Sequence, residues 1–205
     1  MIEKISWLGH ASFKIKGAGI VLYIDPWKLK GKIEPADIIL VGHSHYDHFS
    51  PADIQKISRP MTILVVPGDC AKQLKGNIKI MKPGDILTVD NVTIESVPAY
   101  NPNKAYHPKA NKWMGFIVTL DKERLYYASD TDLIPEMKEV KNIDVALFPV
   151  GGTYTMNPEE AAEAAEIVNP EIAVPYHYGD IVGSEEDAQS FASLYSGQTR
   201  ILKPQ

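Results

Sequence analysis

The sequence predicts an α/β sandwich in which β-sheets form the interior and helices cover them. Short apolar and β-branched runs fill the first part of the chain, and similar runs alternate with helical segments in the second part. No linker-like change of composition, low-complexity tract or internal repeat divides the 205 residues. We therefore expect a single domain that spans residues 1–205.

The expected strands are short runs rich in valine, isoleucine and aromatic residues, bounded by glycine, proline, asparagine or aspartate. They cover residues 2–8, 11–16, 20–25, 37–41, 62–66, 78–81, 86–89, 92–97, 113–120, 124–128, 144–150, 172–176 and 199–202. The runs 113–120 and 124–128 predict a hairpin, because only Asp121, Lys122 and Glu123 separate them.

Helix starts are marked by capping residues. Ser50 precedes Pro51, and Asn157 precedes Pro158, so a capping residue and a proline at the first helical position open each helix. The second of these helices should end near residue 168, and Ser184 should cap a last helix. Residues 68–75 favour a short helix, whereas residues 99–112 form a connection long enough to suggest a functional loop.

Composition narrows the class of protein. The 44% hydrophobic content is that of a water-soluble globular chain, and the net charge of -5 with a pI near 5.7 argues against general nucleic-acid binding. The single cysteine, Cys70, is consistent with a reducing compartment. Neither a signal-peptide core nor a membrane span is visible, so we expect a cytoplasmic protein without a membrane partner. The sequence leaves open whether it forms a homo-oligomer.

The stretch from Gly42 to His48 is the densest group of metal-ligand side chains. Four of its seven residues are histidine or aspartate, and three of the six histidines of the chain fall between positions 43 and 48. The apolar run 37–41 precedes it, so the cluster lies where a buried strand ends and a loop begins. Imidazole and carboxylate groups bind zinc and similar divalent ions.

The spacing within this cluster suits two neighbouring metal ions. Residues two apart in an extended segment face the same way, so His43 and His45 can bind one ion, whereas Asp47 and His48 can serve a second ion. Two ions need more ligands than these four. The candidates lie at strand ends or in a neighbouring loop, and they are His107, Asp130 and His177.

At this point the sequence resembles the metallo-β-lactamase superfamily. His43, His45, Asp47 and His48 match its H-x-H-x-D-H signature residue for residue. The run Trp7 to Ala11 (Trp-Leu-Gly-His-Ala) is similar to a branch of small prokaryotic metal-dependent hydrolases that includes relatives of L-ascorbate-6-phosphate lactonase. The family places its middle histidine directly after a strand, where this chain has Ala99-Tyr100-Asn101, so His107 is the candidate for that ligand.

The resemblance implies a four-layer αββα sandwich with two divalent metal ions at one edge of the sheets. Zinc is the first choice, with manganese or iron as alternatives. By carry-over, His43, His45 and His107 bind the first ion. Asp47, His48 and His177 bind the second ion, and Asp130 bridges both, with a hydroxide between the ions.

The implied activity is hydrolysis of an ester, lactone or phosphodiester by the hydroxide. Asp47, His10 and Asp25 are the candidate catalytic residues, and we expect His10 and Asp25 to support the ligands or contact the substrate. Lys104, Lys109 and Lys112 lie near His107 in a segment without acidic residues, which favours a small anionic substrate. A nucleic-acid phosphodiesterase and a catalytically silent metal-binding or sensing module remain as alternatives.

Overall fold

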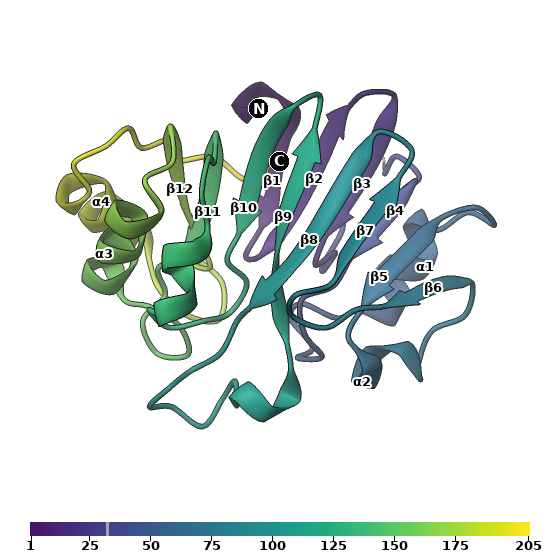
Figure 1. Ribbon diagram of the computed structural model, residues 1–205, viewed down its shortest axis with the longest axis horizontal. Helices are drawn as coiled ribbons and strands as arrows, with labels where there is room; N and C mark the ends of the chain where they lie inside the picture. Colours follow the sequence, from purple (N-terminus) through teal and green to yellow (C-terminus); the bar gives the residue numbers. More distant parts are fainter. Residues whose placement is uncertain (32) are drawn as a thin grey trace.

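The computed structural model describes residues 1–31 and 33–205, and within these residues it contains two six-stranded sheets (Figure 1). The first sheet has the order β1 (Ile5–Gly9), β2 (Ser12–Gly17), β3 (Ile20–Ile24), β4 (Ile38–Leu40), β5 (Ile63–Val66), β6 (Asn77–Ile80). The second has the order β12 (Ile172–Tyr176), β11 (Val145–Pro149), β10 (Glu123–Tyr127), β9 (Met114–Leu120), β8 (Val92–Pro98), β7 (Ile86–Val89).

Both sheets are mixed, and strand direction determines where their loops gather. Strand β2 is antiparallel to both β1 and β3, so β1 and β3 run the same way, and β3 to β6 are parallel. In the second sheet β10, β11 and β12 are parallel. The carboxyl ends of parallel strands meet at one edge of a sheet, which is where α/β proteins place their ligand sites.

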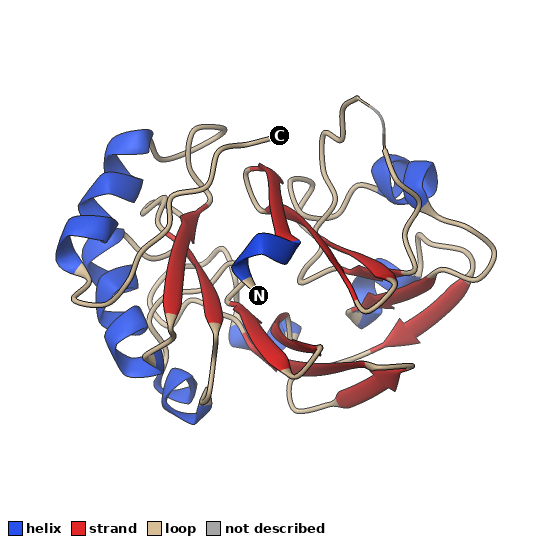
Figure 2. Ribbon diagram, turned by 90° about the horizontal axis from the view of Figure 1, so that it is seen from above, coloured by secondary structure: helices blue, strands red, loops and turns tan. Residues whose placement is uncertain are grey.

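Helices cover the outer faces of the two sheets and complete an αββα sandwich (Figure 2). Helices α1 (Pro51–Ile57) and α2 (Gly68–Ala71) lie beside the first sheet, and α3 (Pro158–Val168) and α4 (Glu185–Leu194) beside the second (Figure 1). Short 3₁₀ turns occur at Ile2–Lys4, Lys109–Asn111 and Pro135–Glu139. Among the described residues, no helix is both long and apolar enough to cross a membrane.

Alternation along the strands divides the interior into two cores. In β3, Leu22 and Ile24 belong to the main core between the sheets, whereas Val21 and Tyr23 point to a second core under α1. Phe13 joins the sheets, because its ring centroid lies 6.1 Å from that of Tyr127. These buried apolar side chains hold the two sheets face to face and fix the relative position of their loop edges.

Most of the expected elements are present, and the helix caps are confirmed. Ser50 accepts a hydrogen bond from the backbone of Asp53, and Asn157 forms a capping box with Glu160. The strand expected at residues 2–8 begins only at Ile5, after a 3₁₀ turn.

The prediction of a strand at residues 199–202 is wrong. Thr199 forms only an isolated bridge to Ala173, because the chain then leaves the sheet edge and runs towards Trp7, whose carbonyl accepts from Gln205.

Candidate metal centre

The predicted metal-ligand residues come together at the loop edge of the two sheets. His10 directly follows β1, Asp25 follows β3, and the 43–48 cluster follows β4. From the second sheet, Asp130 lies just after β10 and His177 directly after β12. Strands that are far apart in the sequence therefore deliver all these side chains to one place, as the common direction of β1, β3 and β4 requires.

Two of the groups of side chains that could hold a metal ion have no residue in common. One ligand atom from each of His43, His45 and His107 lies within 4.8 Å of the others. The same criterion joins a second group, namely His10, Asp47, His48 and His177. His43 and His45 thus fall in one group and Asp47 and His48 in the other, and a third possible group, Asp25, His43 and His48, connects the two. Residues 45–48 form a turn, so this division does not arise from alternation in an extended segment.

Asp130 lies between the two groups. Its Oδ2 is 3.3 Å from Nε2 of His107 and 3.2 Å from Nε2 of His177. Its Oδ1 is 3.1 Å from Nε2 of His48. One buried carboxylate therefore faces histidines of both groups, which is the position expected of a residue that bridges two ions.

The unpaired polar atoms of the site fit a metal centre. Nε2 of His43, His48, His107 and His177 is buried and has no hydrogen-bond partner within the described part of the chain. Buried polar groups are almost always paired, because an unpaired one costs about 1–3 kcal/mol. Several such nitrogen atoms directed at one carboxylate are best explained by cations that they share, and neutral imidazole with carboxylate is a donor set for zinc, manganese or iron.

Electrostatics within the site favour bound positive charge. Burial would raise the pKa of Asp130, but His177 and His48 hold it well below its usual range. Burial would also raise the pKa of Asp47, but the hydrogen bond from His10 and the charge of His48 lower it to about 2. Burial holds the pKa of His43 well below its usual range. These shifts favour ionised carboxylates and a neutral His43, the forms that bind metal. Burial would lower the pKa of His48, but Asp130 and Asp25 hold it well above its usual range.

Asp25 supports the second group from behind and is completely buried. Its carboxylate accepts from Nδ1 of His48 at 2.7 Å, from the Tyr127 hydroxyl at 2.6 Å and from the backbone N–H of Gly42 at 2.8 Å. The hydrogen bond to Nδ1 fixes the tautomer of His48 and directs its Nε2 towards Asp130. The structure thus places Asp25 directly behind His48, a histidine of the second group.

Asn101 supports the first group in the same way, a role that the sequence did not reveal. Its Oδ1 accepts from Nδ1 of His107 at 2.7 Å and from the backbone N–H of His107 at 2.9 Å. Its Nδ2 donates to the carbonyl of Tyr154 at 3.0 Å. An asparagine six residues from a loop histidine gives no signal in the sequence, because the contact exists only after the loop has folded back.

We expect the Asn101→Ala substitution to weaken metal binding about 10- to 100-fold, because His107 loses the partner that orients its ring. Metal affinity measured by competition with a chromophoric chelator checks this. The Asn103→Ala variant is a suitable control, since Asn103 lies exposed in the same loop. Equal affinity in both variants would contradict the supporting role of Asn101.

Several residues of the site have strained backbones. His10, Asp25, Ser129 and His177 adopt φ values of 48°, 44°, 59° and 64°, in the left-handed region that non-glycine residues rarely occupy. Such strain costs of order 1–3 kcal/mol per residue and collects at functional sites.

Two of the three lysines near His107 do not carry free positive charge. Lys104 pairs with Asp132 at 2.6 Å and Lys109 with Glu136 at 2.7 Å, so both hold the 99–112 loop to the following segment. The sequence missed these pairs because the acidic partners follow the next strand pair. Lys112 forms no ion pair within the described residues and lines a pocket of about 590 Å³.

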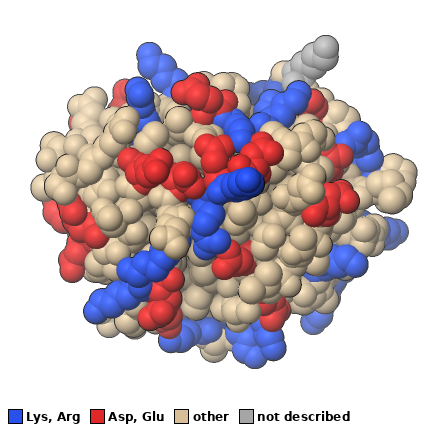
Figure 3. All heavy atoms as spheres, turned by 45° about the horizontal axis from the view of Figure 1, so that its top comes forward, with Lys and Arg blue, Asp and Glu red and all other residues tan. Residues whose placement is uncertain are grey.

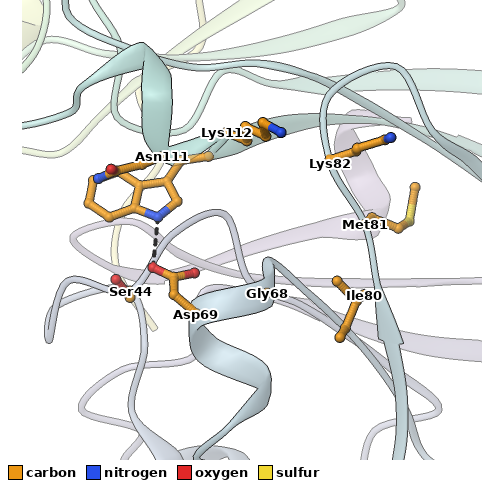
Figure 4. Close-up of a pocket in the computed structure, with 9 residues that line it drawn as sticks. Ser44, Gly68, Asp69, Ile80, Met81, Lys82, Asn111 and Lys112 are labelled. Carbon is orange, nitrogen blue, oxygen red and sulfur yellow. Dashed lines mark hydrogen bonds between the residues drawn. The ribbon is translucent and has the colours of Figure 1, made fainter.

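This pocket lies next to the first group of histidines. Ser44, which lies between His43 and His45, forms part of its wall, and so does Trp113, whose ring centroid is 4.9 Å from that of His45. In Figure 4, Lys82 and Lys112 lie on the side of the pocket opposite Ser44 and Asp69. Asp69 accepts from the Trp113 indole at 2.9 Å and so holds the ring against the histidines.

An αββα sandwich with histidines and carboxylates gathered at its loop edge defines the class of metal-dependent hydrolases with the metallo-β-lactamase fold. The chain belongs to the β-lactamase superfamily, since the family model described as "Beta-lactamase superfamily domain" matches residues 4–177. Within it, the chain is a member of the UPF0173 metal-dependent hydrolase family.

The relatives support this assignment over nearly the whole chain. A UPF0173 metal-dependent hydrolase from Pyrococcus abyssi is 34% identical, and the match covers 98% of this chain and 96% of the relative. Another from Methanopyrus kandleri is 32% identical over 92% of this chain and 89% of the relative. A crystal structure from Parabacteroides distasonis, described as a metal-dependent hydrolase, has a TM-score of 0.88, 35% identity and coverage of 98% and 93%.

Proposed function

We propose that the protein hydrolyses an ester, lactone or phosphodiester bond in a small anionic molecule with the help of two divalent metal ions. One observation carries this proposal. Four buried histidine Nε2 atoms without hydrogen-bond partners in the described chain surround the site, and three of them lie within 3.3 Å of the single carboxylate of Asp130. That arrangement supports two adjacent cations, and a buried two-ion centre suits hydrolysis.

One ion would be held by His43, His45 and His107. The other ion would be held by Asp47, His48 and His177, and Asp130 would bind both ions. When bound, two such ions lower the pKa of a shared water towards neutral and polarise the oxygen of the bond that is cleaved. Zinc suits this donor set best, and the mixed nitrogen and oxygen ligands also admit manganese or iron. The chain itself contributes the fixed geometry and a site from which bulk water is largely excluded.

The residues expected to be catalytic act through the ligands. Asp25 orients His48, and His10 donates from Nε2 to Oδ2 of Asp47 at 2.9 Å. The hydrogen bond from His10 keeps Asp47 ionised and turned towards His48 and His177. We therefore assign His10 and Asp25 to positioning, and we assign Asp47 to direct contact with a metal ion.

The charge distribution supports an anionic small molecule rather than a nucleic acid. Lys82 and Lys112 are exposed at the pocket beside the first histidine group, and neither forms an ion pair within the described residues. On the face shown in Figure 3, basic and acidic side chains are intermixed and form no broad basic surface. A small anion can use two lysines, whereas a nucleic acid needs an extended positive track.

Metal analysis beside turnover tests this proposal. Elemental analysis of the purified, metal-repleted protein should find about two ions per chain, and the His45→Ala variant should lose about one. Hydrolysis should appear in a panel of lactones, esters and phosphodiesters and disappear on addition of a chelator. A repleted protein without bound transition metal would refute the proposal. A fully loaded protein without turnover on a broad panel would instead favour a binding module.

A further inference from the structure

The metal centre is most accessible from solution at His45. The side chain of His45 is half-buried, whereas the other predicted ligands are buried. The next residue, Tyr46, is 68% exposed. The pocket that contains Lys82 and Lys112 lies on this side of the centre, because its wall includes Ser44, which precedes His45.

The pocket adjoins the metal centre but does not include it. Within the described residues, no predicted metal ligand belongs to the lining. Ser44 and Trp113 form the boundary, and the ring centroid of Trp113 lies 5.1 Å from that of His43 and 4.9 Å from that of His45. A substrate that fills the pocket must therefore extend past this boundary to reach the ions. The group held in the pocket and the bond that reacts are then separate parts of one molecule.

Two lysines without partners give the pocket its charge. Lys82 and Lys112 are exposed, and neither ammonium forms an ion pair within the described part of the chain. Asp69 is the acidic residue of the lining, and its carboxylate accepts from the Trp113 indole at 2.9 Å and from the backbone N–H of Cys70 at 3.1 Å. It lies across the pocket from the lysines (Figure 4). The lining thus carries a net single positive charge, which suits an anion with one negative charge.

The backbone holds both lysines at the pocket. Lys112 has a φ of 55° and a ψ of 35°, in the left-handed region that glycine and asparagine tolerate best. The backbone N–H of Lys82 donates to Asp85 at 3.0 Å, and its carbonyl accepts from the Ser96 hydroxyl at 2.6 Å. Lys112 thus has a strained backbone and an ammonium without an ion-pair partner in the described chain. Strain of this kind collects at functional sites, so it points to a role in binding.

The rest of the wall suits a short carbon chain. Ile80, Met81 and Trp113 contribute apolar surface to the lining. The volume of about 590 Å³ lies in the range of about 300–1,000 Å³ that is typical of small-molecule sites. Methylene groups between an anion and the reacting bond would pack against this surface.

We infer that the substrate carries a carboxylate separate from the bond that is cleaved, and that Lys82 and Lys112 bind this carboxylate. A carboxylate has the single charge that matches the lining, whereas a phosphate monoester carries about 1.5 to 2 negative charges at neutral pH. The inference rests on the proposed hydrolysis and narrows its substrate class to an ester or lactone with a remote carboxylate. Lys82 and Lys112 then determine specificity without touching the reacting atoms.

Matched esters test the remote carboxylate. 4-Nitrophenyl hydrogen adipate and its methyl ester contain the same reacting bond and differ in the remote charge. The metal-loaded protein should hydrolyse the charged ester with a kcat/KM about three- to tenfold higher, chiefly through a lower KM, because remote binding acts equally on ground state and transition state. This preference should shrink between about 50 and about 500 mM salt. Equal kcat/KM values for the two esters would overturn the inference.

Three variants locate the carboxylate. Lys82→Gln and Lys112→Asn should each lower the ratio of the two kcat/KM values about threefold, and asparagine suits the left-handed backbone at position 112. Lys79→Gln is the matched control, because Lys79 is an exposed lysine of β6 that does not line the pocket. An unchanged ratio in both pocket variants, or the same loss in Lys79→Gln, would contradict the assignment.

A binding measurement separates this inference from the proposed hydrolysis. Monomethyl adipate should bind saturably to the metal-loaded protein in ligand-observed NMR titrations, and about threefold more weakly to the Lys112→Asn variant. Such binding without turnover of either ester would support the lysine site and refute ester hydrolysis. Turnover of both esters without preference would leave the proposed function standing and overturn the carboxylate site.

Discussion

The Asp130→Asn variant should bind about one metal ion or none where the unchanged protein binds about two, and its hydrolysis should fall about 100-fold or more. Asp130 is the residue that faces both groups of histidines, with Oδ2 3.3 Å from His107 and 3.2 Å from His177 and Oδ1 3.1 Å from His48. Asparagine keeps the shape but removes the negative charge and one of the two acceptor oxygens. Neither ion would then have its shared ligand.

The magnitude follows from the place of Asp130 in the site. Loss of a residue that only supports a ligand typically lowers metal affinity or activity 10- to 100-fold, so loss of a bridging ligand should exceed that range. Metal content by elemental analysis and initial rates on the best substrate provide the two measurements. A variant that retains two ions and full activity would show that Asp130 is not a ligand.

Asp132→Asn is the matched control. Asp132 lies two residues away and is 7% exposed, but its carboxylate pairs with Lys104 at 2.6 Å instead of facing the histidines. We expect this variant to lose some stability of the 99–112 loop and to retain both ions. If Asp130→Asn and Asp132→Asn lose metal equally, the effect reflects disturbance of the loop and not the loss of a ligand.

The sequence predicted those parts of the site that depend on local spacing. The cluster from His43 to His48 follows an apolar run, so its place at the end of a strand could be predicted from the sequence. The prediction of an extended segment is wrong from residue 45 onward, because residues 45–48 form a turn in which the backbone N–H of His48 donates to the carbonyl of His45. The caps at Ser50 and Asn157 are local in the same sense, because each involves a backbone group three residues away. The αββα arrangement itself came from resemblance, and both the sheets and the family match confirm it.

Long-range contacts were the parts that the sequence could not supply. Asn101 holds His107 only because the 99–112 loop folds back on itself, and Lys104 loses its free charge to Asp132, which follows a different strand pair. The expectation of a free positive patch failed for this reason at Lys104 and Lys109. The left-handed backbones of His10 and His177 are likewise imposed by packing at the sheet edge, since neither residue favours φ values of 48° and 64°.

The Asp25→Ala variant should lose about 3 kcal/mol or more in its free energy of unfolding, because three buried donors lose their acceptor at about 1–3 kcal/mol each. These donors are the backbone N–H of Gly42, the hydroxyl of Tyr127 and Nδ1 of His48. Metal affinity should fall about 10- to 100-fold as well, because His48 is no longer held in one tautomer and orientation. Urea unfolding and chelator competition measure the two effects.

Two further variants separate the effect on stability from the effect on metal. Tyr127→Phe removes one donor and leaves Asp25 bonded to His48, so it should lose about 1 kcal/mol of stability and keep its metal affinity. Asp37→Ala removes a carboxylate of the same sheet that bonds to Val21 and Arg59, far along the strands from the histidines. Asp25→Ala could weaken metal binding no more than these two variants do. In that case the contact of Asp25 with His48 does not affect metal binding, and Asp25 only stabilises the fold. If metal affinity falls only in Asp25→Ala, the buried carboxylate of Asp25 both stabilises the fold and orients His48 for metal binding.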